Sequence, residues 1–519
     1  MSSRLALPLA ALVGFIALSY EIVWFRAYSF VSGVSPRAFG FLLAAYLLGI
    51  ALGSAWSRRY CRDRDAAGDP RALRFIGIFL LAANAGGFLV APALATLATT
   101  LHWAWSLLFV CLVAGMFGAV LPLLSHFAIP ADDRAGARLS YLYLANIVGS
   151  AAGSLLTGFV LMDLFALGEI VLLLTLGGIA CAVVLLVVGS PAGRSRILAA
   201  ALALALGALC WWSAAGVHEA LYERLLLKRD FRGTERFAHL NENRHGVIAI
   251  TSDEVVYGGG VYDGKISVDL VDDRNGIARP FALCAFDRKP REALMVGLSM
   301  GAWAQVVVNL PTLERLTIVE INPGYLDLIP LYPQVASLLD NPKVEIVIDD
   351  GRRWIARHPD RKFDLIVQNT TFYWLAHSTN LLSLEYLEMC RSRMRPSGMM
   401  LFNTTSSRHA MRTALEAFPH CMRIGNNMLC SDQPLEFDAK RWSWALATYR
   451  IDGRNVIDSA NPHHRNQVIQ LLARATGPRE GPENWLESDP GLRQRLDGVE
   501  VITDDNMRCE WHWMGGDGK

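Results

Sequence analysis

Seven long apolar stretches lie before residue 216, and each is long enough to cross a bilayer, which takes about 20 residues. They lie near Leu5–Phe25, Ala38–Trp56, Phe75–Leu97, Trp105–Phe127, Leu139–Met162, Ile170–Val188 and Ile197–Ala215. The first is too long for a cleavable signal, lacks a small-residue cleavage site and precedes further spans. The sequence therefore predicts a membrane domain of about seven transmembrane helices over residues 1–216, in contact with the lipid bilayer.

The chain changes character after residue 216. A charged segment, residues 217–244, is predicted to be a helix and linker that leads out of the membrane. Residues 245–285 alternate short apolar runs with Gly and Asp, which is typical of a small antiparallel hairpin sheet. Residues 286–519 are predicted to form an α/β domain with a C-terminal extension.

Three short runs rich in β-branched residues form the centre of the α/β domain. They are Ala293–Val296, Leu316–Val319 and Val344–Ile348, and segments of helical character separate them. This pattern is typical of parallel strands with helical crossovers. We therefore expect half of a doubly wound, Rossmann-like sheet.

Candidate ligand-binding residues follow these three runs. They are Gly297, Ser299, Gly301, Glu320, Asp350 and Gly351. The first three form a tight turn where the backbone can approach a ligand beside a helix N-terminus. Glu320 closes the second run about twenty residues further on, where such folds place a carboxylate on ribose hydroxyls.

The same turn narrows the class of ligand. It lacks the six-residue dinucleotide fingerprint and the lysine of a phosphate loop, so S-adenosylmethionine or a close relative fits better than NAD or ATP. The alternative is a strand-to-helix turn that binds no ligand. The nine cysteines include no CxxC pair and no zinc-ligand spacing, so no metal is expected.

Five segments resemble a known family, the polyamine aminopropyltransferases, which include spermidine synthase. In order, they are VGLSMGAW, VEIN, VIDDG, FDLIVQNTTFYW and NLLSLEYLEMCRSRMRPSGMMLFNT, and the resemblance covers roughly Gly246 to Thr405. It implies a donor molecule, S-adenosylmethionine or its decarboxylated form. It also implies that Glu320 holds the ribose of this donor and that Asp350 holds its adenine amino group. YEIVWFR and LYLANIVGSAAGSLLTGF are similar to the membrane region of bacterial spermidine synthase-like proteins, so the bacterial inner (cell) membrane is the expected location.

The chain departs from this family where the acceptor amine is held. The aspartate of the family's turn falls at Met300, its catalytic DSSDP loop aligns with Gln368–Phe372, and a Tyr-His pair aligns with Arg279-Pro280. Aminopropyl transfer needs a carboxylate that holds a cationic amine and takes its proton. We therefore expect that the part of the site that binds the donor is retained and that the acceptor is a small molecule other than putrescine. The candidates are a lipid, a glycan, a polyamine-like molecule or the donor's own carboxylate, which would close to a lactone.

The candidate catalytic residues are Asn369, Tyr373 and His377, which follow the predicted fourth strand FDLIVQN. Asn369 ends that strand, where open sheets bind ligands. The pKa of histidine suits proton transfer near neutral pH, and aromatic rings in this loop can stack on a sulfonium cation. A hydrophobic lid with an incidental histidine is the alternative. Asp263 and Asp269, in the hairpin segment, either face the pocket or, as we favour, lie in solvated turns.

Other functions stay open. The chemistry could instead be methyl transfer or the self-cyclising reaction of a lyase. A transporter or binding protein that senses a nucleoside or polyamine would be built on Glu21, Arg26 and the glycines Gly149, Gly153 and Gly158, for which interfacial anchoring and helix packing are the structural alternatives. The net charge of +1 is uninformative, but the sequence has no basic stripe, so no nucleic-acid partner is predicted. A homo-oligomer is left open.

Arginines are distributed unevenly between the loops. One set of loops holds Arg58, Arg59, Arg62, Arg64, Arg71, Arg74, Arg134, Arg138, Arg194 and Arg196, whereas the opposite loops hold almost only Arg26 and Arg37. The positive-inside rule makes the arginine-rich side cytoplasmic, so seven spans place the C-terminal domain outside. S-adenosylmethionine is cytosolic, so the alternatives are a re-entrant seventh segment, donor supply through the membrane, or an inactive external domain. Cys421 and Cys430 would form a hairpin disulfide in an oxidising compartment and otherwise remain buried thiols.

Overall fold

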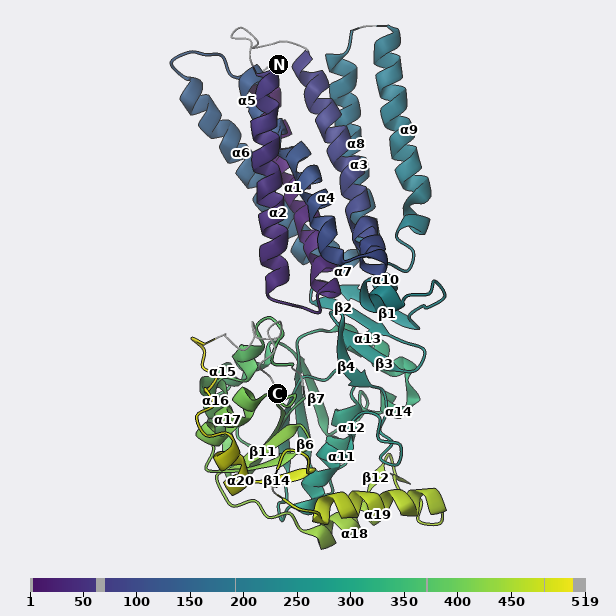
Figure 1. Cartoon of the computed structure of the whole chain (residues 1–519), viewed down its shortest axis with the longest axis vertical. Coiled ribbons are helices and arrows are strands. Elements are labelled where there is room, and N and C mark those ends of the chain that lie inside the picture. The colour runs from purple at the N-terminus through teal and green to yellow at the C-terminus, as the bar shows by residue number, and fades with distance from the viewer. Residues whose placement is uncertain (1–2, 62–70, 192, 370–371, 480, 507–519) are drawn as a thin grey trace. The chain divides into compact units, whose positions relative to one another are not determined.

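A computed structural model describes residues 3–61, 71–191, 193–369, 372–479 and 481–506 of the chain. Contacts divide the chain into two compact units, Met1–Val247 and Ile248–Lys519 (Figure 1). The predicted domain boundaries after residues 216, 244 and 285 are finer than this division and stay a prediction.

The first unit holds seven helical spans that are long and apolar enough to cross a membrane, by length and composition of the described residues. They are built from α1 (Ser3–Val31), α2 (Arg37–Ser57), α3 (Arg71–Thr100), α4 (Ser106–Gly118), α5 (Val120–Ala128), α6 (Ala135–Leu156), α7 (Met162–Leu164), α8 (Leu167–Gly189) and α9 (Arg194–Val217). Each of the seven predicted apolar stretches falls within one of these spans.

Two of the spans are not continuous α-helices. The fourth is divided between α4 and α5, and Pro122 follows the division without an N–H to donate to the carbonyl of Gly118. The hydroxyl of Ser54 on α2 donates to that carbonyl instead, at 2.8 Å. The fifth span passes from α6 through the π-helix η3 (Thr157–Leu161) into α7.

Glycines allow neighbouring helix backbones in this unit to touch. The helix α1 packs along α6, and two glycines of α6 face it. A Cβ atom on Gly149 would lie 1.8 Å from the carbonyl oxygen of Ala11, and one on Gly153 would lie 2.3 Å from that of Phe15. Helix packing, one of the two alternatives for these glycines, is therefore what the structure shows at both positions.

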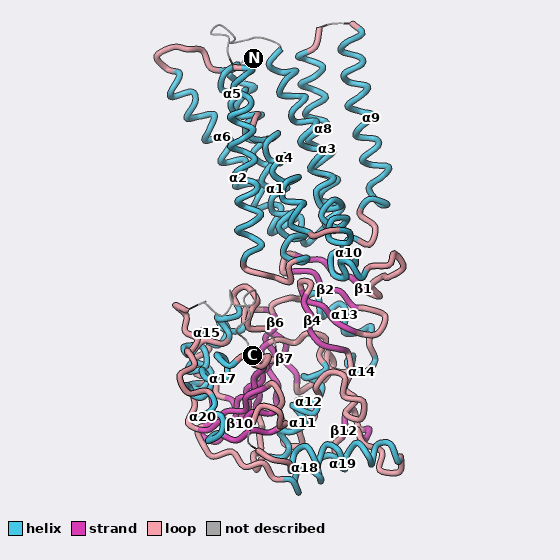
Figure 2. Tube along the Cα trace, in the orientation of Figure 1, coloured by secondary structure: helices cyan, strands magenta, loops and turns pink. Residues whose placement is uncertain are grey.

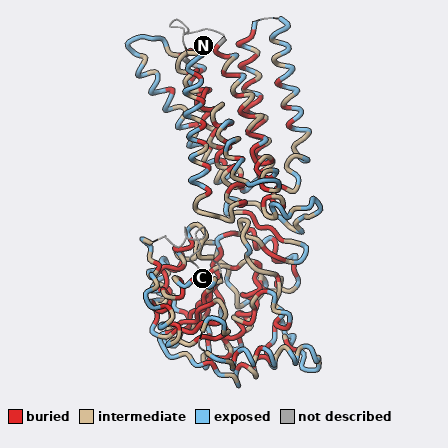
Figure 3. Tube along the Cα trace, viewed as in Figure 1, coloured by how far each residue is buried: buried red, intermediate tan, exposed pale blue. Residues whose placement is uncertain are grey.

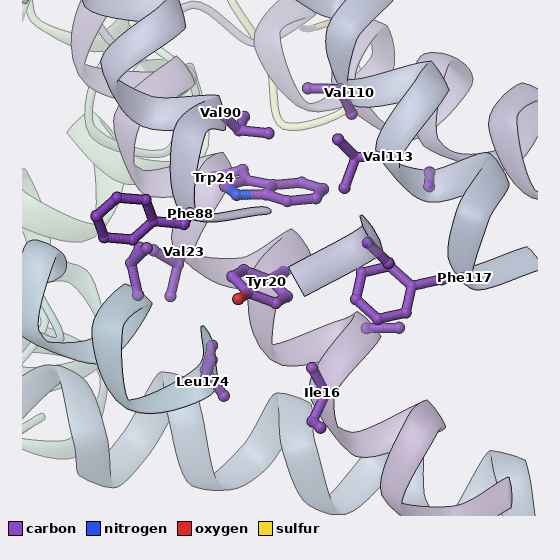
Figure 4. Packing of buried hydrophobic residues seen from close by; sticks show 14 of the residues in the cluster. Ile16, Tyr20, Val23, Trp24, Phe88, Val90, Val110, Val113, Phe117 and Leu174 are labelled. Atoms are coloured by element: carbon purple, nitrogen blue, oxygen red, sulfur yellow. The ribbon is translucent and has the colours of Figure 1, made fainter. Parts of the chain in front are cut away.

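Large aromatic side chains fill the centre of the bundle. Tyr20 and Trp24 are fully buried on α1 and stack with their ring centroids 5.4 Å apart (Figure 4). The hydroxyl of Tyr20 shares a 2.8 Å hydrogen bond with that of Thr175 on α8. The outer helix α9, by contrast, exposes large apolar side chains such as Leu198, which is 60% exposed (Figure 3). An apolar outer surface of this kind suits lipid better than water.

The segment predicted as a linker, residues 217–244, contains regular structure. It includes α10 (Leu221–Leu227), the 3-10 turn η4 (Lys228–Asp230) and β1 (His239–Asn243), and its contacts group it with the first unit. Arg224 donates to the hydroxyl of Thr96 and Arg229 to the carbonyl of Leu101, both at 2.6 Å. These hydrogen bonds connect the segment to the C-terminal end of α3.

An eight-stranded mixed sheet forms the centre of the second unit (Figure 2). Its order is β14-β10-β11-β9-β8-β5-β6-β7. The strands are β5 (Glu292–Val296), β6 (Arg315–Glu320), β7 (Val344–Ile348), β8 (Phe363–Gln368), β9 (Met394–Asn403), β10 (His420–Ile424), β11 (Asn427–Ser431) and β14 (Leu486–Ser488). Neighbours from β9 to β7 run parallel, whereas β11, β10 and β14 add antiparallel pairs. The predicted parallel, Rossmann-like half is confirmed.

Both faces of this sheet are buried. On β5, Ala293 and Met295 pack into one hydrophobic cluster, whereas Leu294 and Val296 pack into another. Successive side chains of a strand point to opposite faces, so each cluster lies on one face. The helices of the unit are α11 (Ala278–Phe281), α12 (Ala302–Val308), α13 (Gly324–Leu328), α14 (Pro333–Ala336), α15 (Gly351–Arg357), α16 (Leu384–Ser392), α17 (Arg408–Ala417), α18 (Ala439–Thr448), α19 (Pro462–Thr476) and α20 (Asp489–Arg495).

A separate four-stranded sheet has the order β1-β2-β3-β4. It adds β2 (Gly246–Ile250), β3 (Val255–Gly258) and β4 (Val261–Lys265), whose two pairings are antiparallel. These strands account for the hairpin sheet that was predicted within residues 245–285. A short hairpin of β12 (Arg450–Ile451) and β13 (Arg454–Asn455) lies in the C-terminal extension.

Candidate functional site

The candidate ligand-binding residues lie along one edge of the eight-stranded sheet. The parallel neighbours β5, β6 and β7 end there, so Gly297, Glu320 and Asp350 come from adjacent strands. The N–H of Gly297 donates to the carbonyl of Val319 at 2.9 Å, and the N–H of Asp349 donates to that of Glu320 at 3.0 Å. Open α/β sheets bind ligands at this carboxyl edge.

Glu320 is the last residue of β6 and is only 4% exposed. Its Oε2 accepts a 2.7 Å hydrogen bond from the N–H of Leu298, and its Oε1 accepts a 2.8 Å bond from the N–H of Asn322. Burial raises the pKa of this carboxyl group, and the backbone N–H bonds oppose the rise. Each oxygen keeps a lone pair that can accept a further hydroxyl donor.

The turn after β5 is held in left-handed backbone conformations. The angle φ is 84° at Gly297, 48° at Ser299 and 81° at Gly301. Glycine adopts such angles without steric cost, which accounts for two of these three positions. Met300, which stands where the resembled family has an aspartate, is buried in the hydrophobic core. The turn itself therefore supplies backbone and a hydroxyl group, but no carboxylate.

Asp263, on β4, supplies a carboxylate beside this turn. The hydroxyl of Tyr325 donates to its Oδ2 at 2.6 Å, and the hydroxyl of Ser299 donates to its backbone carbonyl at 3.2 Å. Burial is the main reason that the pKa of Asp263 is raised to about 6; the charge of Glu320 adds to the rise, whereas hydrogen bonds from Tyr325 and Ser299 oppose it. The expectation of a solvated turn is therefore wrong for Asp263.

Asp269 behaves as a turn residue, as expected. Its Oδ1 accepts hydrogen bonds from the N–H groups of Val271 at 2.8 Å and of Asp272 at 3.3 Å. The two aspartates of the hairpin segment thus differ in role, and only the contacts of Asp263 with distant residues reveal it.

Asp350 begins α15 as its N-cap. Its Oδ1 accepts a 2.7 Å hydrogen bond from the N–H of Arg353. A Cβ atom on Gly351 would lie 2.5 Å from Val296 Cγ1, so glycine allows the start of α15 to lie against the end of β5. The preceding Asp349 is hydrogen-bonded by the guanidinium of Arg353, which is the main reason that its pKa is lowered.

The three candidate catalytic residues lie in different settings. Asn369 follows β8, and its Oδ1 accepts a 3.1 Å hydrogen bond from Asn403. Tyr373 is partly buried, with its ring 5.1 Å from that of Trp374. His377 is exposed and has a left-handed φ of 65° before the 3-10 turn η7 (Ser378–Leu381). Residues 370 and 371 of this loop lie outside the described part of the chain, and the catalytic roles stay predictions.

A polar network continues from Asn369 along the same edge. Asn403 ends β9, and its Oδ1 accepts a 3.0 Å hydrogen bond from Asn426 in the turn between β10 and β11. Arg279 on α11 donates to the side-chain oxygens of Asn426 and of Asn427, the latter at 3.0 Å. Sequence reasoning noted Arg279 only as a departure from the family, because its partners lie 147 and 148 residues away.

In the first unit, Glu21 and Arg26 do not form a pair. Arg26 donates to the carbonyl of Gly246 at 3.3 Å and contacts the sulfur of Met162 at 3.0 Å. Glu21 is only 9% exposed, and the described residues include no hydrogen-bond or ion-pair partner for it. A cavity of about 310 Å³ lies among α1, α2, α4, α5 and α6, and its polar lining includes Tyr46 and Asn146.

The fold of the second unit is that of a doubly wound, Rossmann-like α/β domain, and the candidate residues lie at the carboxyl edge of its sheet. Within that class, residues 280–424 match the family described as the spermine/spermidine synthase domain. The chain is 31% identical over 118 residues to a polyamine aminopropyltransferase of Desulforudis audaxviator (strain MP104C), covering 22% of this chain and 42% of that protein. This region of the chain is therefore spermidine synthase-like.

A second relative and a solved structure are also similar to the chain. A polyamine aminopropyltransferase of Agathobacter rectalis is 26% identical over 113 residues, which is 22% of this chain and 39% of that protein. The crystal structure of spermidine synthase from Thermotoga maritima aligns with 16% identity and a TM-score of 0.34, over 46% of this chain and 88% of that one. The chain thus spans about two fifths of the length of the curated relatives.

Proposed function

We propose that the chain is a membrane-bound transferase of the aminopropyltransferase type. Its donor is S-adenosylmethionine or, as in the resembled family, the decarboxylated form. The acceptor nucleophile forms a bond to the carbon next to sulfur on the propyl arm and loses a proton. The carbon–sulfur bond breaks, its electron pair stays on sulfur, and methylthioadenosine leaves as a neutral thioether.

The arrangement around Glu320 carries this proposal. Glu320, Asp350 and the turn from Gly297 to Gly301 end three adjacent parallel strands, and Glu320 is fixed by two backbone N–H groups. A buried carboxylate in this place suits ribose hydroxyls, and the start of α15 suits the adenine. The match of residues 280–424 to the spermine/spermidine synthase domain supports the same donor.

The acceptor half differs, and we propose that putrescine is not the acceptor. A second ammonium group needs carboxylates, because a buried unpaired cation is costly. The corresponding edge at β8 and β9 instead carries the amides Asn369, Asn403 and Asn426 and the cation Arg279.

The donor is tested with purified full-length protein in detergent micelles. It is incubated with S-adenosylmethionine or its decarboxylated form, with and without membrane extract, and the nucleoside products are resolved by mass spectrometry. Methylthioadenosine is the expected product, and Glu320→Gln should weaken donor binding about ten- to a hundred-fold because charge-assisted hydrogen bonds are lost.

Glu314→Gln is the matched control, since Glu314 precedes the opposite end of β6 and is exposed in an ion pair with Arg291 at 2.9 Å. S-adenosylhomocysteine as the product would make the protein a methyltransferase, and methylthioadenosine with a lactone and no acceptor would make it a self-cyclising lyase. Failure to bind any of these nucleosides would sink the proposal.

The buried carboxylate of Glu21 favours a second candidate, a binding or transport function of the first unit for a cationic amine. Ionisable groups inside membrane spans mark ligand or ion paths more often than they stabilise a fold. Uptake of labelled putrescine into proteoliposomes would support it if Glu21→Gln abolished uptake and Glu219→Gln, at an exposed ion pair with Arg236, did not. Equal uptake by all three proteins, or none by the unmodified protein, would remove this candidate.

A further inference from the structure

The residues around Arg279 fit the shape of its guanidinium group. A Cβ atom on Gly276 would lie 1.8 Å from Arg279 Nη2, so only glycine leaves room there, and Gly276 also has a φ of 63°. The side chain lies over the ring of Trp303, with the guanidinium carbon 5.0 Å from the ring centroid. Stacking on an indole holds the plane of the guanidinium fixed.

The hydrogen-bond partners of this cation in the described part of the chain are all neutral. Its Nε donates to the carbonyl of Gly276 at 2.8 Å and its Nη2 to that of Asn275 at 3.2 Å. Its Nη1 donates to the amide oxygens of Asn426 and Asn427. The group is partly buried, and burial lowers its pKa, although an arginine keeps its charge in proteins.

The charge of Arg279 is only partly compensated, because no carboxylate of the described residues forms an ion pair with its guanidinium. Asp273 acts on it electrostatically, but both oxygens of Asp273 accept backbone N–H groups, from Ile277 at 2.6 Å and Ala278 at 3.0 Å. Tyr262 also acts on it and is neutral at physiological pH. A partly buried cation with neutral partners is costly unless an anion binds to it.

Asn427 adds an unused hydrogen-bond donor next to Arg279. It is fully buried at the start of β11, and its Nδ2 has no hydrogen-bond partner in the described residues. Buried amide groups of this kind are nearly always paired in native proteins. A planar oxyanion can accept hydrogen bonds from guanidinium and amide donors together.

The network places this cation between the two halves of the site. Through Asn426 and Asn403, Arg279 is linked to Asn369 at the end of β8. On the other side it lies near Tyr262, which precedes Asp263 on β4. Any group bound by Arg279 is therefore next to both the donor pocket and the edge where the acceptor enters.

We propose that Arg279 and the amides of Asn426 and Asn427 bind a carboxylate group of the substrate, where a diamine-using enzyme would bind an ammonium group. This inference rests on the proposed function. The carboxylate belongs either to an amino-acid-like acceptor or to the aminobutanoyl arm of S-adenosylmethionine itself, which the decarboxylated donor lacks.

Two pairs of probes that differ by one carboxylate test it by calorimetry on the full chain. One pair is S-adenosylmethionine and its decarboxylated form. The other is 4-aminobutanoate and putrescine, added to protein saturated with methylthioadenosine. The unmodified protein should prefer the carboxylate probe in at least one pair, and that pair identifies the source. Arg279→Gln should reduce the affinity for that probe about ten- to a hundred-fold and leave methylthioadenosine binding unchanged.

Two further variants separate recognition from folding. Asn427→Asp is nearly isosteric and supplies an internal counterion to Arg279, so it should abolish the preference while the protein stays folded. Arg315→Gln is the control, because Arg315 starts β6 at the opposite edge of the sheet and is exposed. Equal losses for both members of each pair, or a preference that survives Asn427→Asp, would overturn the inference. Failure of methylthioadenosine to bind the unmodified protein would instead contradict the donor site, and the inference would fall with it.

Discussion

Asp263 connects the small sheet to the turn after β5, where we propose that the donor binds. It accepts the hydroxyl of Tyr325, lies beside the turn that contains Ser299, and has a pKa of about 6 because of its burial. A sulfonium donor is a cation, whereas its product methylthioadenosine is neutral. The ionisation of Asp263 can therefore discriminate between donor and product.

This leads to a prediction about pH. Below about pH 6 Asp263 gains a proton and loses its attraction for the sulfonium, so affinity for decarboxylated S-adenosylmethionine should fall about tenfold from about pH 7 to about pH 5. Calorimetry at both pH values should show no such change for methylthioadenosine, and Asp263→Asn should flatten the donor's pH dependence. An equal slope for donor and product would contradict the role given to Asp263.

Residues of the site differ in how far the sequence could predict them. Glu320 and Asp350 end short apolar runs, so strand periodicity alone placed them at one edge. Asp263 and Arg279 could not be recognised in this way, because Tyr325 lies 62 residues from the first and Asn426 lies 147 residues from the second. Their importance arises from tertiary contacts, which leave no periodic signal in the chain.

At the scale of elements, the contact between α1 and α6 depends on backbone proximity. Gly149→Ala would place a methyl group 1.8 Å from the carbonyl oxygen of Ala11, so the helices must separate. We expect a cost of about 1–3 kcal/mol, as for overpacked cores. The matched control is Gly177→Ala on α8, where no atom lies within 4 Å of the added carbon. Thermal unfolding in detergent micelles measures both, and equal melting temperatures would contradict the packing described.

The edge strand β14 is held to β10 by a buried ion cluster. Glu487 accepts a 2.7 Å hydrogen bond from Arg423 Nε and bonds of 2.8 and 2.7 Å from Arg495. Burial alone would raise the pKa of Glu487, but the bonds from Arg495 and Arg423 outweigh it and hold the pKa below its usual range. The cluster is therefore complete only while Glu487 is ionised.

Glu487→Ala should lower the free energy of unfolding by about 3–5 kcal/mol, because it leaves buried arginine charge unpaired. The lowered pKa means that this contribution is present above the unfolded pKa and is lost as the pH falls through the folded value. Scanning calorimetry of the full chain should show that the unmodified protein loses stability more steeply in acid than Glu487→Ala does. The control, Glu416→Ala, breaks an exposed pair with Arg412 and should change little.

Elements were predicted well where composition and length agree. The three central strands and all seven apolar spans were located, because each is a bounded apolar run. The division of the fourth span and the π-helix at Thr157–Leu161 were not predicted, since apolar residues continue through both. Compensation for Pro122 comes from Ser54 on another helix, which no local pattern shows.

For the whole molecule, the distribution of basic residues bears on the predicted side of the membrane for the second unit. The loops with Arg134, Arg138, Arg194 and Arg196 lie at the end of the helical unit where the N-terminus lies (Figure 1). The segment after the seventh span adds basic residues at the other end, including Arg224 and Arg229, which reduces the asymmetry without reversing it. Charge therefore still favours a second unit outside the cytoplasm.

A cysteine pair provides a measurement of this side. Cys421 and Cys430 are opposite each other on β10 and β11, and their sulfur atoms lie 3.0 Å apart. In an oxidising periplasm we expect these two cysteines to form a disulfide. Cells are alkylated before lysis, and mass spectrometry then shows whether the two cysteines are linked or are free thiols. Recovery of both as free thiols, together with fluorescence of a C-terminal green fluorescent protein fusion, would place the second unit in the cytoplasm.

The candidate site has two parts with separate hydrogen bonds, and they adjoin between the neighbouring strands β5 and β8. The residues proposed to bind the donor lie at the ends of β5, β6 and β7, whereas the arginine–asparagine network belongs to α11, β8, β9 and the β10–β11 turn. Substitutions in one part leave the bonds of the other intact. If the proposed function holds, a few substitutions around the β10–β11 hairpin can change the acceptor without altering the residues proposed to bind the nucleoside.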